Sequence, residues 1–164
     1  MKTFLAEEGC ALALWESLYA ALEGSVGTAQ YRTLYRRMPD GTLDDVIDNG
    51  DLGCAYFVSS MLSAFGLISH GVHTTVRMTL SDMQESGWIE VGDPEPGSVV
   101  LWGEKHGDDG RPHFHMGICV DPTHAIEHSA ITKSPRKIGI TELKMPDGSP
   151  RPPIAYFVHP KLRL

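Results

Sequence analysis

Apolar positions along the first half of the chain recur with the spacing of helices. Between residues 54 and 65 they fall at 54, 57, 58, 61, 62 and 65, which is the repeat of an amphipathic helix, and Gly66 provides a stop signal. Similar spacing predicts a helix over Glu7–Glu23 and a shorter one over Thr79–Ser86. The segment Ala29–Met38 fits either a short helix or a strand.

The second half of the chain changes to short apolar runs that are separated by Pro- and Gly-containing turns. We expect strands at Ser98–Trp102, His113–Val120, His124–Ala130, Ile138–Leu143 and Ile154–His159. Helices followed by an antiparallel sheet predict an α+β fold. We expect one domain over residues 1–164, with a helical part over about 1–90 and a sheet part over about 91–164.

Composition narrows the class of partner. The 164 residues are 41% hydrophobic and carry a net charge of −7, as expected of a globular protein with an acidic surface. This acidity argues against a nucleic-acid partner and against adhesion to anionic membranes. Three cysteines, at positions 10, 54 and 119, do not form a disulfide framework and suit a reducing compartment.

The ends and apolar runs of the chain bear on its location. No stretch approaches the length of uninterrupted apolar residues that a membrane span needs, and no secretory signal is visible before Glu7 and Glu8. We therefore expect a cytoplasmic, monomeric protein that reaches an external substrate only after release or export without a cleavable signal.

Cys54 is the most informative candidate for chemistry. It follows the turn-forming run Asp48–Gly53 and lies on the first turn of the predicted helix. Unpaired backbone N–H groups and the positive end of the helix dipole favour a thiolate at that position. This placement predicts a nucleophile.

A histidine-bearing strand supplies the base. Alternation along His113–Val120 places His115 on a polar or small face, and a short hairpin to the next strand would bring His128 within reach of it. A thiol hydrolase needs a thiolate, an imidazole that takes and returns the proton, and a group that orients the imidazole. We assign these roles to Cys54, His115 and His128. Glu127 should point to the face opposite His128, which counts against it.

These residues resemble the NlpC-type family of cell-wall cysteine peptidases, which have a papain-like fold. The matching segments are Gly53-Cys54 with its helix, Pro96–Trp102, His115-Met116-Gly117-Ile118 and Ala125–Ser129, within about half of the chain. The family usually has Asp-Cys-Ser-Gly at the nucleophile, whereas this chain has Gly53-Cys54-Ala55-Tyr56.

The resemblance implies hydrolysis of an amide bond in peptidoglycan stem peptides, without a cofactor. It also implies an oxyanion or substrate-binding role for Tyr35, which stands in for a family tyrosine upstream of the cysteine, and for Gly53 and His113. Backbone N–H groups at the start of the Cys54 helix would hold the oxyanion.

Two other interpretations stay open. His113-x-His115 places two imidazoles on one strand face, as in LytM-type zinc peptidases. Further ligands could come from the other histidines at positions 70, 73, 106, 124 and 128. In that case Cys54 would be dispensable. A non-catalytic papain-like binding module is the third possibility, and an incomplete triad would distinguish it.

Overall fold

The computed structural model describes residues 10–106 and 110–163, which fold into helices packed on an antiparallel sheet. The α-helices are α1 (Leu14–Ser25), α2 (Gly53–Ala64) and α3 (Val76–Glu85), and a 3-10 turn covers Pro160–Leu162. The strands are β1 (Tyr35–Arg37), β2 (Leu43–Asp45), β3 (Ile89–Val91), β4 (Val99–His106), β5 (Pro112–Cys119), β6 (His124–Ser129), β7 (Ser134–Gly139) and β8 (Pro153–Val158). The expected α+β class is confirmed.

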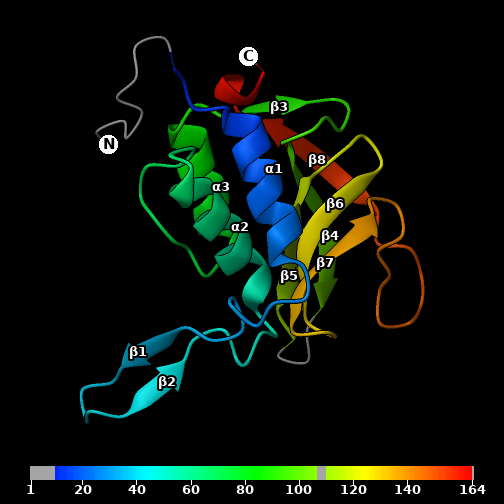
Figure 1. Ribbon diagram of the computed structural model, residues 1–164. Helices are drawn as coiled ribbons and strands as arrows, with labels where there is room; N and C mark the ends of the chain where they lie inside the picture. The colour runs from blue at the N-terminus through cyan, green and yellow to red at the C-terminus, as the bar shows by residue number, and fades with distance from the viewer. Residues whose placement is uncertain (1–9, 107–109, 164) are drawn as a thin grey trace.

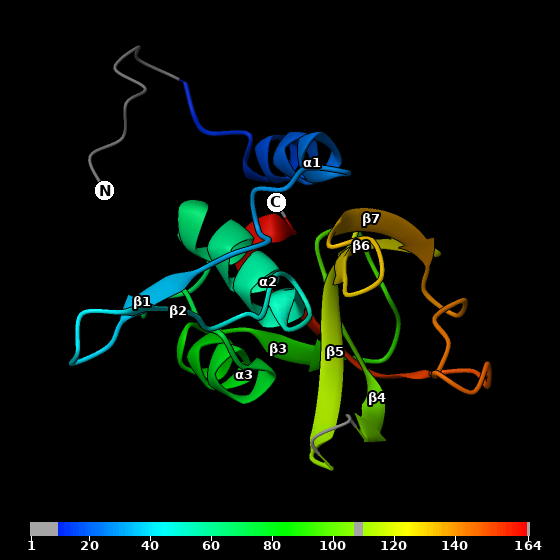
Figure 2. The same ribbon diagram turned by 90° about the horizontal axis from the view of Figure 1, so that it is seen from below.

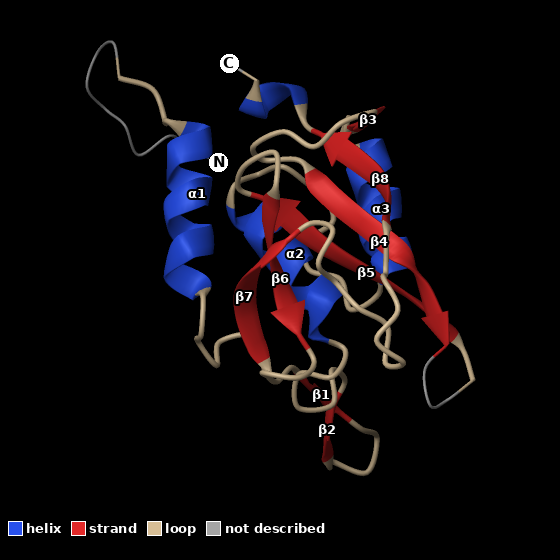
Figure 3. Cartoon of the chain, turned by 90° about the vertical axis from the view of Figure 1, so that its right-hand side faces the viewer, coloured by secondary structure: helices blue, strands red, loops and turns tan. Residues whose placement is uncertain are grey.

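Six strands form the main sheet in the order β3-β8-β4-β5-β6-β7, and every neighbouring pair is antiparallel. α2 lies between α1 and α3 and runs alongside β5 (Figures 1 and 2). Seen from the side of the sheet, the strands cross in front of α2 (Figure 3). The helix that carries Cys54, α2, is therefore packed against the sheet.

Two apolar clusters hold these layers together. The larger one joins the helices to the sheet and includes Leu18, Phe57 and Ile118, all fully buried. The smaller one contains Trp102 and Cys119 with Ile140, whose carbonyl accepts a hydrogen bond from the Trp102 indole at 2.8 Å. Burying side chains of this size is the main source of stability in such a fold.

α2 matches its predicted extent closely. It begins at Gly53 and ends at Ala64, and Gly66 adopts φ +65, the left-handed conformation that commonly terminates helices. The other helices differ more from prediction. α1 begins at Leu14 rather than at Glu7, and residues 7–9 of the expected helix lie outside the described residues. α3 begins at Val76 because the Thr75 hydroxyl caps it, accepting from the Met78 N–H.

Several strands were predicted wrongly or missed. The segment 29–38 contributes only β1, which pairs with β2 in a hairpin that projects from the body (Figures 1 and 3). The strand expected at Ile138–Leu143 instead runs over Ser134–Gly139. Ile140 and Leu143 follow the end of β7 and are nevertheless buried, which explains why the apolar pattern there suggests a strand.

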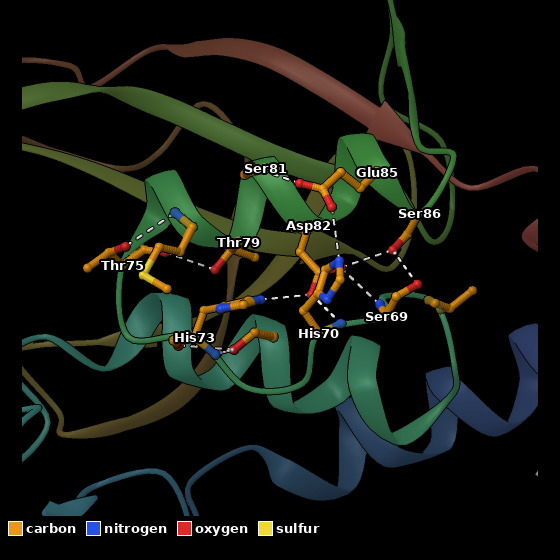
Figure 4. Close-up of polar contacts among 12 residues, drawn as sticks. Ser69, His70, His73, Thr75, Thr79, Ser81, Asp82, Glu85 and Ser86 are labelled. Atoms are coloured by element: carbon orange, nitrogen blue, oxygen red, sulfur yellow. Dashed lines mark hydrogen bonds and ion pairs between the residues drawn. The ribbon is translucent and has the colours of Figure 1, made fainter.

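A buried polar network ties α3 to the loop that precedes it (Figure 4). The Asp82 carboxylate, 2% exposed, accepts from the backbone N–H groups of Ser69 and His70 and from His73 Nε2 at 2.8 Å. Burial opposes ionisation of Asp82, but these donors outweigh it and lower its pKa to about 2. These hydrogen bonds therefore hold the loop against α3.

No helix within residues 10–106 and 110–163 is both long and apolar enough to cross a membrane.

Candidate active site

The candidate nucleophile Cys54 is the second residue of α2 and is partly buried. The chain approaches it through a tight turn in which Asp48, Asn49 and Gly50 all have positive φ. Backbone N–H groups of Gly50 and Leu52 both donate to the Ile47 carbonyl, which closes this turn. The helix begins directly after this loop turn, at Gly53. Cys54 therefore lies in the first turn of the helix, as the sequence predicts.

His115, on β5, is the imidazole that the structure brings to Cys54. Burial alone would favour a neutral thiol and a neutral imidazole. Charge attraction and hydrogen bonding between the two side chains outweigh it, so the pKa of Cys54 is lowered and that of His115 is raised to about 9. Backbone N–H groups of Met116 and Ala55 also favour the thiolate. The pair therefore favours thiolate and imidazolium, the charge state of a thiol nucleophile.

Glu127, on β6, orients His115. Its Oε2 lies 2.8 Å from His115 Nε2, and its side chain is 1% exposed. Burial opposes ionisation of this carboxyl, but hydrogen bonds and attraction from His115 and Arg136 outweigh it and lower its pKa. An ionised carboxylate at this distance accepts from the imidazole and fixes its orientation.

The assignment of the orienting role to His128 is therefore wrong, and the reason is strand register. β5 and β6 pair Gly117 with Glu127, so Glu127 shares the face of Gly117 and His115. His128 projects to the opposite face, where Met116 and Ile118 are buried. A register shift of one residue reverses which of two neighbouring side chains reaches a given face.

His128 is instead packed beneath the start of α2. The ring is 1% exposed, and neither of its nitrogens has a hydrogen-bond partner among the described residues. Burial lowers its pKa, and the nearby charges of His115, Arg32 and Lys133 add to this effect against the opposing influence of Glu127. His128 is therefore a neutral ring that supports the turn leading into α2.

Gly53 is required by the approach of that ring. A Cβ at Gly53 would lie 2.5 Å from His128 Nδ1 and 2.7 Å from Cε1, closer than real side chains come. Gly117 is required for a similar reason beside His115, because its Cβ would lie 3.1 Å from both Glu127 Cβ and the Trp102 ring. The absence of a side chain there lets Trp102 pack against His115, with ring centroids 5.5 Å apart.

The remaining sequence candidates are placed differently. Tyr35 lies on the projecting hairpin and is 60% exposed, so the structure does not bring it to Cys54 for the oxyanion or substrate-binding role that the resemblance implied (Figure 1). His113 lies on β5, and its carbonyl accepts from Arg151 Nη2 at 2.5 Å. Arg151 also donates through Nε to the Gly103 carbonyl, so it links β4 to β5 near His115.

Sequence reasoning rejected Glu127 and missed Arg136 and Arg151 as members of the site. Identifying Glu127 requires only the register between β5 and β6, because Glu127 is next to His128 in the sequence. Arg136 and Arg151 carry no local motif and reach the site through pairing with β6 and through the loop before β8. Their signal lies in topology rather than in residue spacing.

The structure also bears on the metal-site alternative. Among the described residues, no group of three or more His, Cys, Asp or Glu side chains is arranged to hold a metal ion. The His115 ring already forms hydrogen bonds with Glu127 and Cys54, and His128 lies on the other face of the sheet.

No protein-family model matches the chain, and no curated protein matches it either.

Proposed function

We propose that the chain is a papain-like cysteine hydrolase of the NlpC type that cleaves an amide bond, with peptidoglycan stem peptides as the favoured substrate. Cys54 is the nucleophile, His115 the acid and base, and Glu127 the orienting group. The observation that carries the proposal is the continuous contact from Cys54 through His115 to the buried Glu127. The peptidoglycan substrate rests on the sequence resemblance alone.

The first half of the reaction follows from the charges of the pair. The Cys54 thiolate attacks the amide carbonyl carbon, and negative charge moves to the carbonyl oxygen. Backbone N–H groups at the start of α2 are the natural donors to that oxygen. The His115 imidazolium then gives its proton to the departing amine as the C–N bond breaks, which leaves a thioester on Cys54.

The second half releases the acid. Neutral His115 takes a proton from water as the water oxygen attacks the thioester carbon. Breaking the C–S bond frees the carboxylic acid and restores the thiolate and imidazolium. Glu127 accepts from the imidazole throughout and stabilises its charged form, as the orienting group of a catalytic triad does.

This mechanism predicts a rate profile with two limbs. Activity should rise with pH as Cys54 loses its proton, because only the thiolate attacks. It should fall again as His115 loses its proton, at a pKa of about 9 in the resting enzyme, because the leaving amine then has no proton donor. Turnover that does not depend on pH in this way would contradict an acting thiolate–imidazolium pair.

The direct test is digestion of purified peptidoglycan, with the released muropeptides identified by mass spectrometry. The wild type should produce new peptide termini within the stem, and Cys54→Ala and His115→Ala should not. Cys119→Ala is the matched control, because Cys119 is buried in the second apolar cluster and its pKa is raised by burial to about 11. Equal digestion by Cys54→Ala and the wild type would refute the nucleophile.

A further inference from the structure

The buried carboxylate of Glu127 binds a different cation at each oxygen. Oε2 contacts His115, and Oε1 pairs with Arg136 Nε. β6 and β7 place Glu127 and Arg136 directly opposite each other, so their side chains share one face of the sheet. The line of contacts from Cys54 through His115 and Glu127 therefore continues to Arg136, whose side chain is one third exposed.

Charge alternates along this line: the Cys54 thiolate, the His115 imidazolium, the Glu127 carboxylate and the Arg136 guanidinium. A carboxylate buried with only one partner is expensive, and a guanidinium is well suited to satisfy the second oxygen. Without Arg136 the line would carry a net negative charge in a site from which water is largely excluded. The carboxylate would then draw more strongly on the His115 proton, which must leave when the amine departs.

We propose that Arg136 is a positioning residue of the hydrolase: it holds Glu127 in the orientation that His115 requires and balances its charge. This inference rests on the proposed function, because it assigns Arg136 a part in the same reaction. Arg136 acts through Glu127 and has no assigned contact with substrate.

Other charged groups besides Arg136 also act on the pKa of His115. Cys54 and Glu127 face the imidazole directly. Arg151 lies within electrostatic reach of both of those residues, and its Nε and Nη2 atoms donate to backbone carbonyls. On the other face of the sheet, the neutral His128 senses Arg32 and Lys133. Changing Arg136 leaves all of these groups in place.

The test is titration of the His115 ring by nitrogen NMR in the wild type, Arg136→Gln and Arg136→Lys. Loss of the positive charge should raise the pKa of His115 by about one pH unit in Arg136→Gln, whereas Arg136→Lys should stay near the wild type. Arg136→Met, whose stem fills similar space, repeats the neutralisation if the glutamine variant does not fold. In Glu127→Gln, adding Arg136→Gln should move the titration much less, because the mediating carboxylate is gone.

Lys137→Gln is the matched control. Lys137 is the next residue on β7, and it pairs at the surface with Glu23 at 3.0 Å rather than with Glu127. It removes the same charge from the same strand and should leave the His115 titration unchanged. A merely structural role for Arg136 would lower the melting temperature without moving that titration.

The two hypotheses can fail separately. An unchanged His115 titration in Arg136→Gln, with Cys54 still hydrolysing substrate in the wild type, overturns the role of Arg136 alone. A shifted titration in a protein whose wild type digests no peptidoglycan overturns the proposed function and leaves the coupling of Arg136 to His115 in place. A shift of equal size in Lys137→Gln would also overturn the inference, because it would show a long-range charge effect instead of one through Glu127.

Discussion

Replacing Gly53 by alanine tests whether the His128 ring supports the turn that leads into α2. The added Cβ would lie 2.5 Å from His128 Nδ1, 2.7 Å from Cε1 and 3.0 Å from Cγ. The ring is fully buried, so it can move only by displacing its neighbours or the first turn of α2. Overpacking of this kind costs about 1–3 kcal/mol, and each kcal/mol lowers the melting temperature by roughly 2–4 °C in a chain of this size. We expect Gly53→Ala to melt several degrees lower than the wild type.

Calorimetry or thermal circular dichroism measures this difference, and two further variants isolate its cause. Gly24→Ala is the matched control, because Gly24 lies exposed in α1 with nothing within 4 Å of its added Cβ, so it should be neutral or slightly stabilising. In His128→Ala the space beneath α2 opens, and adding Gly53→Ala should then cost much less. The reasoning is refuted if Gly53→Ala melts with the wild type, or if its cost is the same with and without the His128 ring.

Three further predictions follow from the site and the polar network. Glu127→Gln should lower turnover by about 100-fold or more, because Glu127 contacts His115 directly. His128→Phe should keep most of the turnover, because His128 does not contact His115. Steady-state kinetics on the same substrate compares the two variants. His128→Phe should also remove a loss of stability in weak acid. The pKa of His128 is lowered, so the unfolded chain binds more protons below about pH 6.5, and wild-type stability falls there by up to about 1.4 kcal/mol per pH unit in chemical denaturation. Asp82→Asn should cost about 2 kcal/mol at neutral pH, a difference that shrinks as pH falls from 3.8 toward about 2, because only the ionised carboxylate gains from its donors.

The sequence was sufficient for the parts of the site that depend on local pattern. Cys54 was placed correctly because a turn-rich run and a helical repeat meet at Gly53, and both signals are local. His115 was placed on a strand because apolar alternation on β5 is long and regular. The general α+β layout followed from the same two periodicities.

The contact of Glu127 with His115 could not be predicted from local pattern, because it depends on the register between two strands. The pairing of Gly117 with Glu127 is decided by the turn between β5 and β6, where one residue more or less would have exchanged Glu127 for His128. Very short elements were missed for a related reason. β1, β2 and β3 have three residues each, too few to show alternation, so β2 and β3 were not predicted and β1 could not be distinguished from a helix.

The central claim is that His115 activates Cys54, and alkylation by iodoacetamide at about pH 6 tests it most directly. Peptide mass spectrometry should show Cys54 labelled faster than the exposed Cys10 and far faster than the buried Cys119, although Cys54 is itself partly buried. In His115→Ala this advantage should disappear. If all three cysteines label in order of their exposure in both proteins, Cys54 is an ordinary thiol and the account is contradicted.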